Sequence, residues 1–206
     1  MKSLFIEARR KNLTLGERAR EFVSKHKEFS IIYSIQFKEL AEKFKKEAEK
    51  QGKKILSFTQ VLGCSFPKLK PSTIILIGSG RFHAVNLASR LKLPIYILEQ
   101  DTIKEVTKEE IEKLETKKKV SMLKFLHADE VGILVSSKPG QNKTSLALKL
   151  KEKLEKKGKK AYLFIADNIS LQELENYTLP IYINTACPGL ALDSSKIINL
   201  EDLKDY

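Results

Sequence analysis

Short runs of apolar and often β-branched residues alternate with longer amphipathic stretches along this 206-residue chain. Runs such as "STIILIG" at 72–78 and "PIYIL" at 94–98 are almost continuously apolar, which is typical of strands buried on both faces of a parallel sheet. The stretches between them have helical spacing, and Leu146, Leu150 and Leu154 form one apolar face. The pattern therefore predicts an α/β fold built from strand–helix–strand crossovers.

The expected elements fall into two groups on either side of a lysine-rich helix over 107–127. Strands are predicted over 3–8, 29–35, 54–58, 72–78, 94–98, 131–136, 161–166 and 180–184. Helices are predicted over 15–26, 37–51, 82–91, 107–127, 143–157 and 170–176. We expect two similar small domains, 1–125 and 126–206, each a parallel sheet flanked by helices. A single large sheet is the alternative.

The chain is basic, with 38 Lys and Arg against 26 Asp and Glu and a net charge of +12. Such a charge favours acidic partners, including ribonucleoproteins. Most of the lysines lie on helical stretches together with glutamates, which is typical of a solvated helix face. The basic runs also lack the interleaved aromatic residues that a surface binding single strands needs. Direct nucleic-acid binding is therefore not favoured, although an RNA-binding module stays an alternative.

Nothing in the sequence indicates a membrane or secreted protein. The longest apolar runs are far shorter than the ~20 residues of a membrane-spanning helix. The first residues, "MKSLFIEARRKN", contain no apolar core of a signal peptide. We therefore predict a cytoplasmic protein without a membrane partner.

Four loops rich in small residues follow predicted strands. They are "QVLGCS" at 60–65, "GSGRFH" at 78–83, "SSKPGQ" at 136–141 and "NTACPG" at 184–189. Ligands of α/β sheets bind at the carboxyl ends of the strands, where these loops lie. The two cysteines of the chain, Cys64 and Cys187, are both in such loops.

Taken singly, these loops leave several interpretations open. A free cysteine is often a small buried hydrophobe, a disulfide is out of place in a reducing compartment, and these two cysteines lack the local spacing of a zinc motif. "GSGRFH" is not a full dinucleotide-binding motif, and its glycines also suit a tight turn before a helix that His83 caps. "SKPGQNK" lacks the P-loop pattern. Asp167 and Asp193 do not form a convincing acid/base pair, so no catalytic residue is predicted.

Taken in order, "LGCS", "GRFH", "SSKPGQ" and "NTACP" resemble the diphthamide synthase family, the 2-(3-amino-3-carboxypropyl)histidine synthases. The resemblance runs from Leu4 to Asp193. It implies related α/β domains that each give one cysteine to a shared [4Fe–4S] cluster, with S-adenosylmethionine as cosubstrate. Non-standard radical chemistry would then transfer a 3-amino-3-carboxypropyl group to a histidine of translation elongation factor 2, the first step of diphthamide biosynthesis.

The resemblance also implies roles for particular residues. Cys64 matches the cluster ligand of the family's second domain, and Cys187 matches that of the third. The two remaining loops are expected to bind S-adenosylmethionine through Gly78, Ser79, Gly80, Phe82, His83, Ser137, Lys138, Gly140 and Gln141.

The sequence departs from the family pattern in two ways. Residues 1–10 resemble the end of the family's first domain, and the chain contains no third cysteine. Gly189 stands where family members commonly have an arginine. We therefore expect the C-terminal part of a split synthase, completed by a separate polypeptide that carries the first domain and third cysteine, or by a full-length homologue. The alternative is a non-catalytic relative that supports a full-length synthase or binds the elongation factor.

Overall fold

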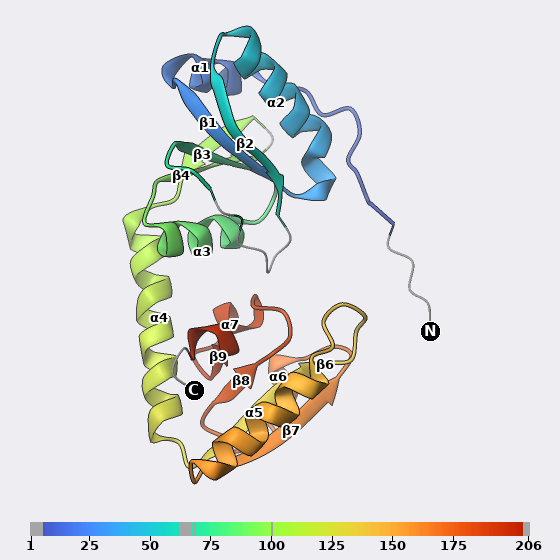
Figure 1. The fold of residues 1–206 in the computed structure, drawn as a ribbon, viewed down its shortest axis with the longest axis vertical. Coiled ribbons are helices and arrows are strands. Elements are labelled where there is room, and N and C mark those ends of the chain that lie inside the picture. The colour runs from blue at the N-terminus through green and yellow to red at the C-terminus, as the bar shows by residue number, and fades with distance from the viewer. Residues whose placement is uncertain (1–5, 62–66, 68, 100, 204–206) are drawn as a thin grey trace. The chain divides into compact units, whose positions relative to one another are not determined.

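The computed structural model describes residues 6–61, 67, 69–99 and 101–203. The chain divides into two compact units, 1–112 and 113–206. The division falls within the long helix α4 (Lys108–His127), which also contains the predicted boundary between 125 and 126. Each unit is a sheet dominated by parallel strands with helices against it, so the predicted fold class is confirmed (Figure 1).

Unit 1 contains a five-stranded sheet in the order β2-β1-β3-β4-β5. Its strands are β1 (Glu28–Tyr33), β2 (Lys54–Gln60), β3 (Thr73–Ile77), β4 (Ile95–Glu99) and β5 (Thr102–Glu105). Its helices are α1 (Glu17–Lys25), the short 3₁₀ helix η1 (Ile35–Phe37), α2 (Lys38–Lys50) and α3 (Arg81–Leu91). The strands pair in parallel except β5, which runs antiparallel to β4.

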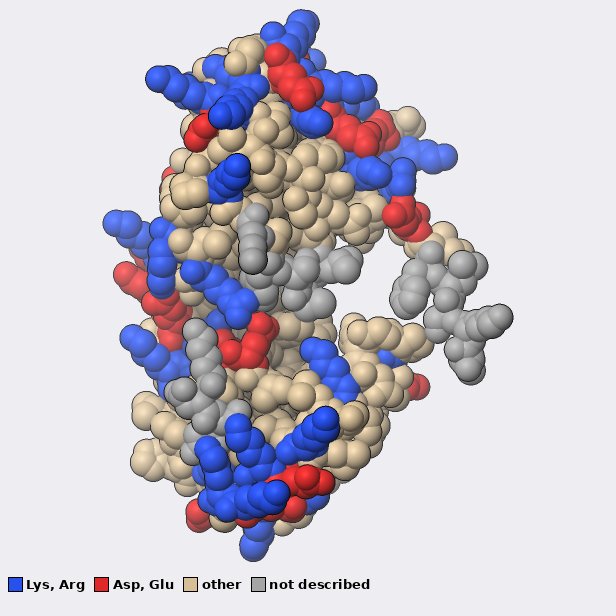
Figure 2. Space-filling view, viewed as in Figure 1, with Lys and Arg blue, Asp and Glu red and all other residues tan. Residues whose placement is uncertain are grey.

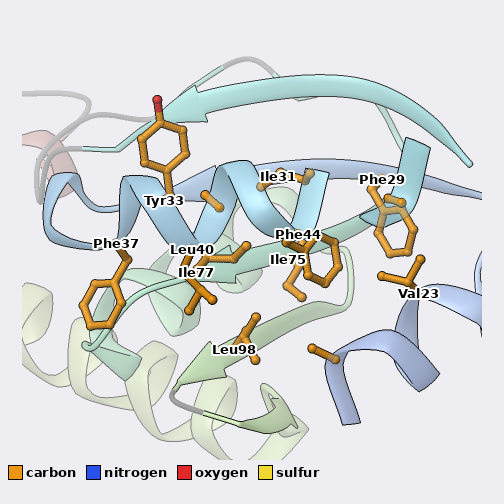
Figure 3. Close-up of a cluster of buried hydrophobic side chains, with 13 residues drawn as sticks. Val23, Phe29, Ile31, Tyr33, Phe37, Leu40, Phe44, Ile75, Ile77 and Leu98 are labelled. Atoms are coloured by element: carbon orange, nitrogen blue, oxygen red, sulfur yellow. The ribbon is translucent and has the colours of Figure 1, made fainter. Parts of the chain in front are cut away.

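Alternate residues of the central strands supply the two cores of unit 1. Phe29 and Ile31 of β1 pack with Phe44 of α2 and Val23 of α1 on one face (Figure 3). Their neighbour Ile32 packs on the opposite face, where it joins Leu87 of α3. Both faces are therefore covered, which explains the nearly continuous apolar runs in the sequence.

Unit 2 contains a four-stranded parallel sheet in the order β7-β6-β8-β9. Its strands are β6 (Glu130–Ser136), β7 (Lys160–Ala166), β8 (Tyr182–Asn184) and β9 (Ile197–Asn199). The end of α4 and α5 (Thr144–Lys156) pack on one face, as contacts of Phe125 and Leu150 show. The other face meets the short helices α6 (Leu171–Leu174) and α7 (Leu190–Asp193), and a 3₁₀ helix η2 (Leu200–Asp202) follows β9.

Some predicted elements differ from the structure. The strand predicted over 3–8 is wrong for its described part, since 6–8 form no strand and Ile6 is exposed. The helix predicted over 170–176 shortens to the single turn of α6. Among the described residues, no helix has both the length and the apolar character needed to cross a bilayer.

A glycine in β6 makes room for an aromatic cluster in unit 2. A Cβ atom on Gly132 would lie 2.3 Å from Tyr182 Cδ1 and 3.1 Å from Phe164 Cε2. The rings of Phe164 and Tyr182 meet edge to face with 5.5 Å between their centroids. The missing side chain therefore lets both rings lie against the strand.

We expect Gly132→Ala to destabilise the protein by about 1–3 kcal/mol, because an added methyl group would overpack this core. Urea unfolding measures the change in free energy. The control is the same substitution in a Tyr182→Leu variant, which lacks the clashing ring. There, Gly132→Ala should lower the free energy of unfolding by less than it does in the wild type. An equal cost in both backgrounds would contradict this explanation.

Candidate functional site

Cys187 lies in the turn between β8 and α7. Thr185 continues the line of β8, since its amide and its hydroxyl both donate to the Leu134 carbonyl, at 3.1 and 2.8 Å. The Cys187 carbonyl then accepts the amide of Leu190 at 3.1 Å, which begins α7. The thiol itself is free and exposed. Cys187 is therefore an exposed residue of the turn and not a core residue.

Gly189, where the resemblance leads us to expect an arginine, has φ −58° and ψ −29°. These are ordinary right-handed helical angles that any residue adopts. The backbone therefore does not require glycine at this position.

The "SSKPGQ" loop lies at the same end of the unit 2 sheet as the Cys187 turn, because β6 and β8 are adjacent parallel strands. The Ser137 hydroxyl donates to the Asp167 carboxylate, and Lys138 Nζ donates to Asn168 Oδ1. Both acceptors follow β7. The Asp167 carboxylate and the Asn168 carboxamide thus fix the position of this loop.

The remaining predicted residues of this loop are exposed. Gly140 has φ +80°, a left-handed conformation that favours glycine, and the Gln141 amide donates to the Lys138 carbonyl at 3.0 Å. The loop is therefore a tight turn that is exposed over 138–141, while Ser136 at its start is buried.

The "GSGRFH" loop of unit 1 joins β3 to α3, and both its glycines are needed. A Cβ atom on Gly78 would lie 2.8 Å from Ser34 Oγ. Gly80 has φ +127°, and a Cβ there would lie 3.2 Å from His83 Nδ1. The Ser34 hydroxyl is buried and has no hydrogen-bond partner in the described chain. The loop thus combines close backbone approach with an unsatisfied polar atom beneath it.

His83 is half-buried in the first turn of α3, and its ring lies 5.1 Å from the ring of Phe82. Burial lowers the pKa of His83, because it disfavours the charged imidazolium, while a hydrogen bond with the Gly80 backbone opposes this. The imidazole is therefore neutral at pH 7. Ser79 is exposed beside it.

Arg81, in the same motif, was not among the predicted site residues, and the structure gives it a structural role. Its guanidinium binds the Glu110 carboxylate through Nε and through Nη2, the latter at 2.8 Å. Glu110 also accepts the Thr107 amide at 2.9 Å, and the Glu110 amide donates to the Thr107 hydroxyl at 3.3 Å. This capping box begins α4, and Arg81 ties it to the start of α3. No local pattern reveals a pair 29 positions apart.

Cys64 and the rest of its loop after Val61 lie outside the described residues. The described residues contain no group of three or more His, Cys, Asp or Glu side chains arranged to hold a metal ion. Cys187 is thus the one cysteine whose surroundings the structure describes, and it could supply a single thiolate to a shared metal centre.

A cavity of about 760 Å³ also lies in unit 2, between β7 and the connection over 168–179. Its lining includes Tyr162 and Tyr177, whose exposed fractions are 44% and 51%. None of the predicted site residues lines it.

Acidic and basic side chains occur side by side on the face drawn in Figure 2. Lys43 pairs with Glu39 at 2.7 Å one helical turn away, and Lys151 pairs with Glu155 in the same way. Such partly exposed pairs contribute little to stability. They form the solvated, mixed-charge helix faces that the sequence predicts.

Residues 1–197 match the diphthamide synthesis protein family. The chain belongs to this family. The resemblance carried by the four loop motifs is therefore confirmed, and family membership covers both units.

Two curated relatives are named 2-(3-amino-3-carboxypropyl)histidine synthase. The chain is 30% identical to the one from Pyrococcus horikoshii over 136 residues, which are 65% of this chain and 40% of the relative. It is 26% identical to the one from Methanocaldococcus jannaschii over 182 residues, which are 84% of this chain and 50% of the relative. The chain thus spans about half the length of these family members.

The fold matches crystal structures of Dph2 from Pyrococcus horikoshii. The first has a TM-score of 0.80 at 21% identity and covers 93% of this chain and 62% of that one. The second, described with a 4Fe-4S cluster, has a TM-score of 0.79 at 22% identity and covers 91% and 60%. The family's fold is therefore present in this chain.

The Arg81–Glu110 pair predicts a pH dependence. The Arg81 guanidinium, helped by hydrogen bonds from Thr107 and opposed by burial, lowers the pKa of Glu110 to about 2, below the ~4.3 of an unfolded chain. The pair therefore stabilises the fold above about pH 4.3, and this contribution is lost as the pH falls towards 2. Arg81 is 40% exposed, so screening by solvent keeps the contribution at about 1 kcal/mol or less.

We expect the unfolding free energy of Glu110→Gln to fall less steeply than that of the wild type as the pH decreases from about 4.3 towards 2. The matched control is Glu109→Gln, its exposed neighbour on the same helical turn. An equally steep fall in Glu110→Gln would contradict the role given to the pair.

Proposed function

We propose that the chain forms the C-terminal part of a 2-(3-amino-3-carboxypropyl)histidine synthase. It would transfer a 3-amino-3-carboxypropyl group from S-adenosylmethionine to a histidine of translation elongation factor 2. The observation that carries this proposal is the free, exposed thiol of Cys187 in the "NTACPG" turn of a chain that matches the family over 1–197.

The residues present fit a share of a [4Fe–4S] cluster. Thiolates are the usual ligands of such clusters, and Cys187 presents one at the carboxyl end of β8. Cys64 would present another from the matching loop of unit 1. The chain has two cysteines, so the third ligand of the family pattern would come from a separate polypeptide or from a full-length homologue.

When bound, the cluster would supply an electron and an iron site for S-adenosylmethionine. The chain's own loops would bind and orient that cosubstrate. Gly78 and Gly80 leave room for close backbone approach, and the buried Ser34 hydroxyl beneath Gly78 has no hydrogen-bond partner among the residues that the structure describes. Neutral His83 could donate or accept a hydrogen bond there without adding charge.

In unit 2 the polar "SSKPGQ" turn, which is exposed over 138–141, could meet the amino-acid end of S-adenosylmethionine. Ser137 and Lys138 are held in place by acceptors that follow β7. The net charge of +12 would steer the chain towards acidic surfaces, such as those of a ribosome-binding factor.

Gly189 favours a second candidate function, a non-catalytic relative that supports a full-length synthase. Its helical backbone angles do not explain the absence of the family's arginine. A cation beside the cluster would therefore be lost without a gain in backbone geometry.

The test is anaerobic reconstitution with iron and sulfide. The full chain is treated alone and together with the region of the Pyrococcus horikoshii relative that it does not match. We expect cluster absorbance and cleavage of S-adenosylmethionine in the mixture, and the loss of both in Cys64→Ala and Cys187→Ala. Ser145→Ala, an exposed change on α5, is the control.

Absence of a cluster in the mixture would contradict the synthase proposal. Cleavage that persists in both cysteine variants would instead favour the non-catalytic role, because the cluster would then be held by other thiolates.

A further inference from the structure

We propose that Asn184 and Asn199 are positioning residues that hold the Cys187 turn in its ligand-presenting conformation before any cluster binds. The inference rests on the proposed function and adds a defined role for β9 to it. It is carried by a set of hydrogen bonds that converge on the three residues around the thiol.

The two asparagines form a buried pair across neighbouring strands. Asn184 ends β8, Asn199 ends β9, and the two residues lie opposite each other in the parallel register. Asn184 Nδ2 donates to Asn199 Oδ1 at 2.8 Å. Their exposed fractions are only 3% and 8%. Buried carboxamides need hydrogen-bond partners, so the groups next to this pair must supply matching donors and acceptors.

The partners of the pair are backbone groups of the cysteine turn. Asn184 Nδ2 also donates to the Cys187 carbonyl at 2.7 Å, and Asn184 Oδ1 accepts the Ala186 amide at 2.9 Å. Asn199 Nδ2 donates to the Pro188 carbonyl at 3.2 Å. The residues before, at and after the cysteine position are thus each bound, while the thiol stays exposed.

The segment before β9 is anchored in turn to α4. The Ser121 hydroxyl donates to the Ser195 carbonyl at 3.1 Å, and Lys124 Nζ donates to the Ser195 hydroxyl at 2.9 Å. The cysteine turn is therefore connected through β9 to a long helix. A ligand held in this way need not be ordered when the cluster binds, and that saving in conformational entropy favours binding.

The experiment compares Asn184→Ala and Asn199→Ala with the wild-type full chain. Asn199→Asp is the conservative variant, since it keeps an acceptor for Asn184 but loses the donor to Pro188. Asn176→Ala, an exposed asparagine of the same unit, is the matched control. Circular dichroism and urea unfolding show whether each variant is folded.

Two readouts are independent of catalysis. Hydrogen exchange of the metal-free chain should be about tenfold faster for peptides covering 185–190 in both alanine variants, because buried hydrogen bonds are lost. In the reconstituted complex, an iron chelator should bleach the cluster about tenfold faster, with Asn199→Asp between the alanine variants and wild type. Asn176→Ala should change neither.

Exchange and bleaching that stay at wild-type rates in folded Asn184→Ala and Asn199→Ala would overturn the positioning role. If both alanine variants fail to fold, a wild-type exchange and bleaching rate in Asn199→Asp would overturn it too. Failure of the wild-type complex to form any cluster would instead overturn the proposed function. The positioning role of the two asparagines would still be tested in that case, because hydrogen exchange is measured on the metal-free chain.

Discussion

Parallel pairing of buried strands is the constraint on which both units depend. In unit 1, β1 lies between β2 and β3, so the loops that follow β2 and β3 leave the same end of the sheet. In unit 2, β6 is paired with β8, which brings "SSKPGQ" and "NTACPG" to one edge. The apolar residues that bury these strands therefore also determine where the polar loop residues can lie. Core packing and the candidate site have a common origin in the sequence.

The same constraint explains which elements could be predicted. Strands β3, β4 and β6 are almost continuously apolar because helices pack on both faces of their sheets. A short stretch of sequence around each strand is therefore enough to reveal its apolar run. Strand β5 was missed because "TIKE" is a polar edge strand with three exposed residues. Strand β9 is as short as β8, but its two isoleucines follow the polar residues at 194–196, so no apolar run of greater length indicates it. The part of the predicted 3–8 strand that the structure describes has no partner, so its apolar residues alone did not make it a strand.

The candidate site divides in a similar way. Gly80 has a positive φ in the turn before α3, so the local sequence indicates its role. Gly78 is restricted by Ser34, which follows β1, so its role depends on the tertiary fold. The binding of Arg81 by Glu110 depends on two elements 29 positions apart, and nothing near either residue indicates it. Asn184 and Asn199 are 15 positions apart on different strands, and β9 had not been recognised. Interactions that require the tertiary fold were therefore the ones that the sequence could not reveal.

The two candidate functions make different physical demands on the Cys187 turn. A scaffold needs its surface and its fold, and an exposed cysteine would serve neither. The structure nevertheless buries two carboxamides and uses three of their hydrogen bonds on the backbone of this turn. Such groups are costly to bury unless each is satisfied, so the turn has little freedom to change shape. A turn held this firmly around an accessible thiol suits metal ligation better than it suits a protein that acts by shape alone.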